Sequence, residues 1–103
     1  MIPGSVRIFV CTERQDMRRS FDALALAVKE RLELDPQSGA LFVFASKRGN
    51  RLKVLWFDRN GYCILYKRLH QARFELPETS QADRPIASID PRALTALLRG
   101  VEK

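Results

Sequence analysis

The sequence predicts an α+β fold, with an antiparallel sheet of four to five strands, a long helix in the N-terminal half and a short C-terminal helix. Two observations favour this class. Strand-like apolar runs separated by turn residues dominate the middle of the chain, and a segment with helical periodicity lies on either side of them. The 103 residues and the apolar content of 46% fit one globular domain covering residues 1–103.

The N-terminal third predicts a strand followed by a helix. Residues 5–11 are rich in β-branched and aromatic side chains, and residues 12–15 form a polar turn. Asp16 is suited to cap a helix that runs from Met17 to about Leu34. Apolar side chains recur there at spacings of three and four: Met17, Phe21, Leu24, Val28 and Leu32. The turn sequence at 35–39, with Pro36 and Gly39, ends the helix.

The middle of the chain predicts a three-stranded meander over residues 40–45, 51–57 and 62–69. An Asn60-Gly61 pair in the second connection is typical of tight hairpins. Alternation along the second strand places basic and apolar side chains on one face and only apolar ones on the other. The sheet is therefore expected to pack against the first helix on one face and partly against the final helix on the other.

The C-terminal third predicts a short strand at 74–76 and a surface loop at 77–87, because that stretch is polar and contains proline. Asp90 and Pro91 then predict a capped helix that runs to Gly100. Its apolar stripe consists of Leu94, Leu97, Leu98 and Val101. This stripe requires a partner surface.

Positive charge is concentrated in residues 36–74, where eight basic residues stand against one acidic residue, Asp58. This segment has a net charge of +7, whereas the whole chain has +6, so the remainder is nearly neutral. Such an asymmetry indicates a polyanionic partner, most simply nucleic acid. The candidate nucleic-acid-binding residues are Lys47, Arg48, Arg51, Lys53, Arg59, Lys67, Arg68 and Arg73.

Two alternatives apply to this segment. Charges at hairpin ends and sheet edges often serve solubility alone, although mixed signs would serve it equally well. The interleaved aromatic side chains would suit base stacking in a single strand. In a small domain Phe42, Phe44, Trp56 and Tyr66 are more often core residues, which leaves Tyr62 as the best exposed candidate. Duplex binding through the phosphate backbone is the favoured mode.

No catalytic or metal-binding arrangement is predicted. Two-metal strand transfer needs converging carboxylates, but the acidic residues here are spread thinly and fit caps and turns: Asp16, Asp35, Asp58 and Asp90. His70 is the single histidine, and Cys11 and Cys63 have no neighbour at metal-ligand spacing. Both cysteines are expected to be reduced thiols. We therefore expect no enzyme activity, cofactor or metal.

The sequence has neither a run of about 18 apolar residues nor the basic and apolar start of a signal peptide. We expect a cytoplasmic protein without membrane contact.

Eight ordered blocks resemble the TnpB accessory proteins of insertion-sequence-66-type transposable elements, the products of their second open reading frame. The blocks are residues 16–19, 21–25, 35–39, 41–44 and 53–56, Asp58 with Gly61, residues 67–69 and residues 73–74. The resemblance spans nearly the whole chain. It implies an accessory factor needed for transposition and encoded beside a separate transposase.

The combined prediction is a non-enzymatic factor that binds element DNA, as a duplex, and assists assembly of the transposase on it. The alternative is a protein adaptor that binds the transposase or a sister subunit without touching DNA. Leu26, isolated on the polar side of the first helix, and the sheet with two apolar faces favour that alternative. Self-association as a homodimer is compatible with both.

Overall fold

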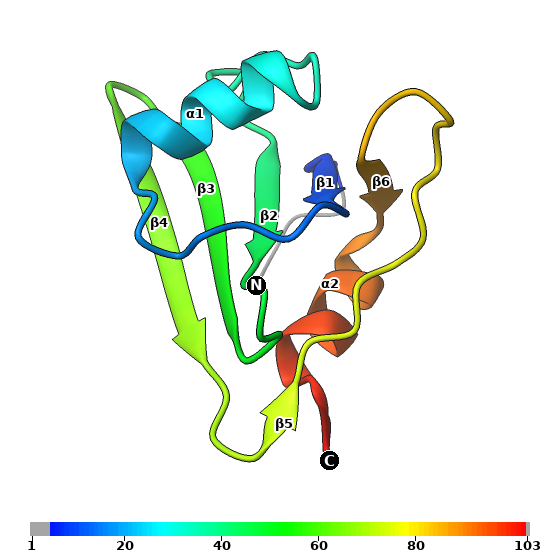
Figure 1. The fold of residues 1–103 in the computed structure, drawn as a ribbon. Helices are drawn as coiled ribbons and strands as arrows, with labels where there is room; N and C mark the ends of the chain where they lie inside the picture. Colours follow the sequence, from blue (N-terminus) through cyan, green and yellow to red (C-terminus); the bar gives the residue numbers. More distant parts are fainter. Residues whose placement is uncertain (1–4, 103) are drawn as a thin grey trace.

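The computed structural model describes residues 5–102 and contains a five-stranded sheet with strand order β4-β3-β2-β1-β6 (Figure 1). The strands are β1 (Ile8–Cys11), β2 (Leu41–Ala45), β3 (Arg51–Asp58), β4 (Gly61–Arg68) and β6 (Ile86–Ile89). The α+β class, the five strands and the meander of β2, β3 and β4 are confirmed.

The prediction of a wholly antiparallel sheet is wrong, because β1 and β2 are parallel. The helix between them carries the chain back across the sheet, which is the connection that parallel neighbours require. On its other side β1 pairs antiparallel with β6, from Ile8 opposite Ile89 to Cys11 opposite Ile86. Strand β6 begins inside the predicted 77–87 loop, so its β conformation depends on the free edge of β1 more than on a strong strand sequence of its own.

Within residues 5–102 the helices are α1 (Phe21–Glu30) and α2 (Pro91–Arg99), and neither is long and apolar enough to cross a membrane. The predicted long helix from Met17 to Leu34 is wrong at both ends. Asp16 does not cap it; its carboxylate accepts the backbone N–H of Arg18, 2.9 Å away, and so forms a turn. At the other end Glu33 adopts a left-handed φ of 56°, which an α-helix cannot continue.

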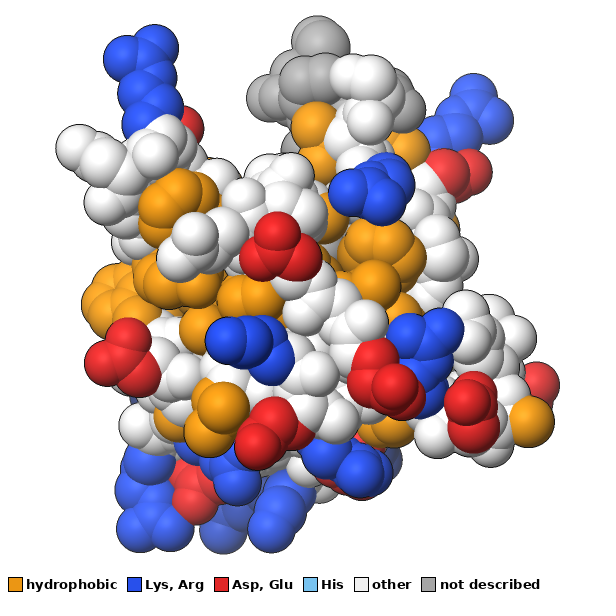
Figure 2. Space-filling view, turned by 90° about the horizontal axis from the view of Figure 1, so that it is seen from above, with side chains coloured by type: hydrophobic (Ala, Val, Ile, Leu, Met, Phe, Trp, Pro, Cys, Tyr) orange, Lys and Arg blue, Asp and Glu red, His pale blue; other side chains and the backbone are white. Residues whose placement is uncertain are grey.

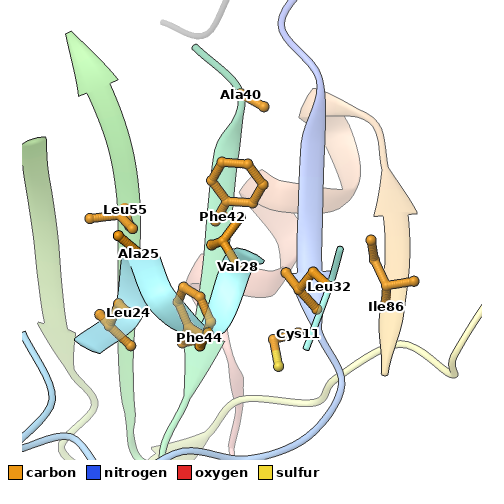
Figure 3. Close-up of a cluster of buried hydrophobic side chains, with 11 residues drawn as sticks. Cys11, Leu24, Ala25, Val28, Leu32, Ala40, Phe42, Phe44, Leu55 and Ile86 are labelled. Carbon is orange, nitrogen blue, oxygen red and sulfur yellow. The ribbon is translucent and has the colours of Figure 1, made fainter. Parts of the chain in front are cut away.

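The two helices cover opposite faces of the sheet, as the sequence predicted. Against α1, the buried side chains of β2 meet those of the helix around Phe42 and Phe44 (Figure 3). Against α2, the core is formed mainly by Ile8, Val10, Val43, Leu52, Val54, Phe74, Leu94 and Leu97. Successive residues of a strand point to opposite faces, so β2 contributes to both cores.

A second, two-stranded sheet joins β5 (Ala72–Arg73) to β7 (Val101–Glu102). Strand β5 lies just before the predicted 74–76 strand, whose first residue, Phe74, is instead a buried core side chain. Gly100 connects α2 to β7 and packs closely against Leu69, which leaves no room for a side chain. Its φ is 74°, and a Cβ there would lie 2.6 Å from Leu69 Cδ1. Val101 consequently leaves the apolar stripe and is half-exposed.

The cap of α2 provides a test of the fold. Asp90 accepts the backbone N–H of Ala93 at 2.8 Å, and Pro91 occupies the first turn, both as predicted. We expect Asp90→Ala to lower the free energy of unfolding by about 1 kcal/mol, because it leaves a helix N–H without its acceptor. Urea denaturation measures this, and the control Asp83→Ala, at an exposed position, should change the free energy of unfolding by less than about 0.5 kcal/mol. Equal effects would contradict the cap.

Candidate nucleic-acid interface

The side chain of Ser46 stabilises the turn between β2 and β3, residues 46–50. The buried Ser46 hydroxyl accepts the backbone N–H groups of Gly49 at 3.2 Å and Arg51 at 3.1 Å. Gly49 has φ 83°, a conformation that glycine adopts without strain. The side chains of Lys47 and Arg48 are exposed on this hydrogen-bonded turn.

Two other segments reach this turn through backbone hydrogen bonds. Gln15 donates to the carbonyl of Ala45 at 2.8 Å, which brings in the loop after β1. The chain after β4 donates twice: Leu69 to Asn50 at 2.7 Å, and Phe74 to Gly49 at 2.6 Å. Segments that are far apart in sequence thus meet at one end of the sheet.

This meeting point gathers six basic residues, which we call the basic end: Arg14, Lys47, Arg48, Arg51, Arg68 and Arg73. Figure 2 looks from above the view of Figure 1, onto the end of the molecule away from this turn, and acidic and basic side chains are mixed over most of that face. Five of the six come from the segment that the sequence singled out.

Arg14 is the member that sequence reasoning missed. It lies outside the basic segment, and only the parallel bridge between Gln15 and Ser46 brings it to the turn. Its guanidinium donates to the carbonyls of Ser46 at 3.0 Å and Phe74 at 3.4 Å. No local signal in the sequence marks this position.

The basic end contains like charges that lie close together. Arg51 and Arg68 stand directly opposite each other in the β3–β4 register. The guanidinium groups of Arg14 and Arg73 both border Gly49, 3.2 and 3.3 Å from the position that a Cβ would occupy there. Like charges directly opposite in a sheet destabilise it. Within residues 5–102, every ion pair instead involves Arg18, Arg31 or Arg84.

The other three candidate cations lie elsewhere. Lys53 is only 7% exposed, and its ammonium donates to the backbone carbonyls of Met17 at 2.8 Å and Arg19 at 2.7 Å. Lys67 donates to the carbonyl of Leu98 at 2.7 Å and so caps the end of α2. Arg59 occupies the β3–β4 turn, just beyond Asp58, and Asp58 lies about 23 Å along β3 from Arg51.

A hollow of about 340 Å³ opens beside the turn. It is lined by Gln15, Asp16, Met17, Ser46, Lys47, Arg48, Asn50 and Arg51. Asp16 is its single acidic side chain, and the Arg18 guanidinium, 2.6 Å away, holds the pKa of that carboxyl well below its usual range. This ion pair leaves Lys47, Arg48 and Arg51 as the uncompensated charges of the hollow.

The aromatic side chains differ in part from the prediction. Phe42 and Phe44 are fully buried, as expected. Tyr62, the predicted exposed ring, is half-buried and packs edge-on against Phe57, with the ring centres 5.1 Å apart. Tyr66 is 49% exposed, and its hydroxyl accepts from Arg51 at 3.2 Å. The ring nearest the basic end is therefore Tyr66.

The acidic and sulfur-containing side chains do not converge. Among residues 5–102, no three His, Cys, Asp or Glu side chains are grouped to hold a metal ion. Asp35 accepts the N–H of Gln37 in the predicted turn. Both cysteines are free thiols, and burial raises the pKa of Cys11.

Comparison with known proteins identifies the family of this chain. The family model for IS66 Orf2-like proteins matches residues 6–103. The chain belongs to the IS66 Orf2-like family. The resemblance inferred from the eight sequence blocks is thus confirmed, and with it an association with transposition.

Two relatives of this IS66 Orf2-like protein come from Sinorhizobium fredii (strain NBRC 101917 / NGR234). The uncharacterized protein y4hO is 41% identical over 99% of this chain and 88% of its own length. The uncharacterized protein y4jC is 30% identical over 94% of this chain and 80% of its own length. No solved structure matches.

Lys53 is expected to stabilise the fold of this IS66 Orf2-like protein. We expect Lys53→Met to lower the free energy of unfolding by about 1–3 kcal/mol, because it leaves two backbone carbonyls without their charged donor. Urea denaturation measures this. Lys47→Met, the same substitution at an exposed lysine, should have little effect. A Lys53 variant as stable as the Lys47 variant would show that the two hydrogen bonds contribute nothing.

Proposed function

We propose that this protein is a non-enzymatic transposition accessory factor that binds duplex DNA through the phosphate backbone and helps assemble the separately encoded transposase on element DNA. The basic end is the proposed contact surface. Arginine and lysine side chains there would position phosphates without reading base edges, so binding would depend little on sequence.

The observation that carries this proposal is the uncompensated repulsion at the basic end. Arg51 faces Arg68 across the sheet, and Arg14 and Arg73 border the same glycine. Folding brings these like charges together at a cost that a bound polyanion would relieve. Solubility alone would not require it, since mixed charges solubilise a surface equally well.

A second candidate is a protein adaptor, favoured by Leu26. This side chain is 52% exposed on α1 and lines a shallow hollow of about 400 Å³ together with Ala25, Pro36 and Tyr62. Exposed apolar groups beside a hollow suit a side chain of the transposase. The two candidates use different surfaces, so separate variants distinguish them.

Salt dependence is the first test of DNA binding. If Lys47, Arg48, Arg51, Arg68 and Arg73 each contact one phosphate, the slope of log K against log salt should be about −4.5, and affinity should fall about 500-fold between about 50 and 200 mM salt. Fluorescence anisotropy with a labelled duplex measures it. Related and unrelated sequences should bind alike.

Charge reversal is the second test. Changing Lys47, Arg48 and Arg51 to Glu should reduce that slope to about −1.8, because two phosphate contacts remain. The matched control changes Lys29, Arg59 and Arg92 to Glu, an equal change in net charge at exposed positions away from the basic end. This control variant should retain most of the slope of log K against log salt.

A transposase pull-down with the same variants separates the candidates. Absence of DNA affinity at about 50 mM salt, together with full transposase capture by the basic-end variant, would reject the DNA-binding proposal and favour the adaptor. Loss of capture by Leu26→Glu would then locate the adaptor surface.

The absence of catalysis is tested directly. The carboxylates of Asp16, Asp35 and Asp90 form a local ion pair, a turn and a helix cap, so they are not arranged to share metal ions. Incubation with element-end DNA and Mg²⁺ or Mn²⁺ should give no nicking or strand transfer on a sequencing gel. Cleavage that disappears on changing one carboxylate would overturn this proposal.

A further inference from the structure

We propose that β4 is a self-association surface, through which two copies of this chain pair edge to edge and antiparallel. Strand β4 is the last strand on one side of the sheet, and none of the helices and strands of residues 5–102 lies beyond it (Figure 1). It is eight residues long and pairs with β3 along its whole length, so it is regular and carries no bulge. An edge of this kind is a ready template for another strand.

The hydrogen-bond pattern shows which backbone groups are available. Leu69 donates to Asn50 across the β3–β4 ladder, and Arg51 directs its carbonyl to Ser46, away from β4. Bonded pairs alternate along an antiparallel ladder. The N–H and C=O groups of Tyr62, Ile64 and Tyr66 therefore point outward, and among residues 5–102 they have no partner.

The opposite edge of the sheet is protected. Strand β6 has only four residues, and the backbone N–H and the hydroxyl of Ser80 both donate to the carbonyl of Ile86, at 2.7 and 3.0 Å. Natural edges are commonly blocked by short length, covering loops or charge. On β4, charges stand only at Lys67 and Arg68, and the six residues before them carry none.

The side chains of β4 favour a second copy as the occupant. With a two-fold axis at Leu65, Ile64 lies opposite Tyr66 of the second copy, and Arg68 lies opposite Tyr62. The antiparallel arrangement keeps the cations of the two copies apart, whereas a parallel arrangement would align them. Leu65, 44% exposed, would meet its own equivalent at the axis.

Such pairing would form about eight backbone hydrogen bonds and one continuous ten-stranded sheet. The two Arg68 residues would lie about 20 Å apart along the strand direction, so the two basic ends would sit at opposite ends of the joined sheet. Arg68 belongs to both surfaces, but Lys47, Arg48 and Arg51, the residues changed in the charge-reversal test, lie outside β4. The dimer and the DNA-binding proposal therefore stand or fall independently.

Sedimentation velocity of the full chain tests the proposal. At about 100 μM, where a dimer with a micromolar Kd is nearly complete, the wild-type protein should sediment as a dimer. Leu65→Lys should weaken the dimer at least about tenfold, because it places two charges at the axis. The matched control Val101→Lys, at a valine that is 50% exposed, should leave the dimer intact.

Disulfide trapping gives an independent measurement that does not depend on weakening the dimer. In a Cys63→Ser background, Leu65→Cys should form an intermolecular disulfide under mild oxidation, because Cα atoms of a non-hydrogen-bonded antiparallel pair are about 4.5 Å apart. Val101→Cys in the same background should not. A monomeric wild-type protein, or a dimer that Leu65→Lys leaves unchanged and Leu65→Cys does not trap, would overturn the proposal.

Discussion

Strands β1 and β2 are covered on both faces, and this constraint determines the rest of the architecture. Phe42 and Phe44 of β2 face α1, whereas Val43 between them faces α2. Neither helix alone would remove both apolar faces from water. Because β1 and β2 are parallel, the connection between them must cross one face, and α1 is that connection. Helix α2 then covers the face that remains.

Lys53 connects strand β3 of this sheet to the loop between β1 and α1. Its ammonium reaches from β3 to the carbonyls of Met17 and Arg19, and its charge also lies 4.8 Å from the centre of the Tyr66 ring. The same loop contains the Gln15 bridge that carries Arg14 to the basic end. A residue that the sequence marked as a DNA contact therefore acts within the fold, where it positions the surface around the other cations.

Much of the fold was predictable because it depends on local chemistry. The Asp90 cap, the hairpins and the alternation along β3 are each determined within a few residues. One error arose where distant segments decide, because β6 forms against the edge of β1. The other arose where local turn chemistry competes with helical periodicity: a turn at Asp16 and a left-handed Glu33 shorten α1. The candidate site also contains residues that local sequence marks and residues that it does not. The sequence located five cations of the basic end, but neither Arg14 nor the burial of Lys53 has a local signal.

The pairing of β1 with β6 has a consequence for biosynthesis. Cys11 leaves the ribosome with the first strand of the sheet, yet its partner across the sheet, Ile86, is made only after the other four strands. Until then one edge of β1 is unpaired, and the apolar sheet face that α2 later covers is exposed to water. Non-local pairings of this kind slow folding and expose apolar surface to other nascent chains. The hairpin of β3 and β4 closes over a few residues, so a nascent chain would acquire this half of the sheet first.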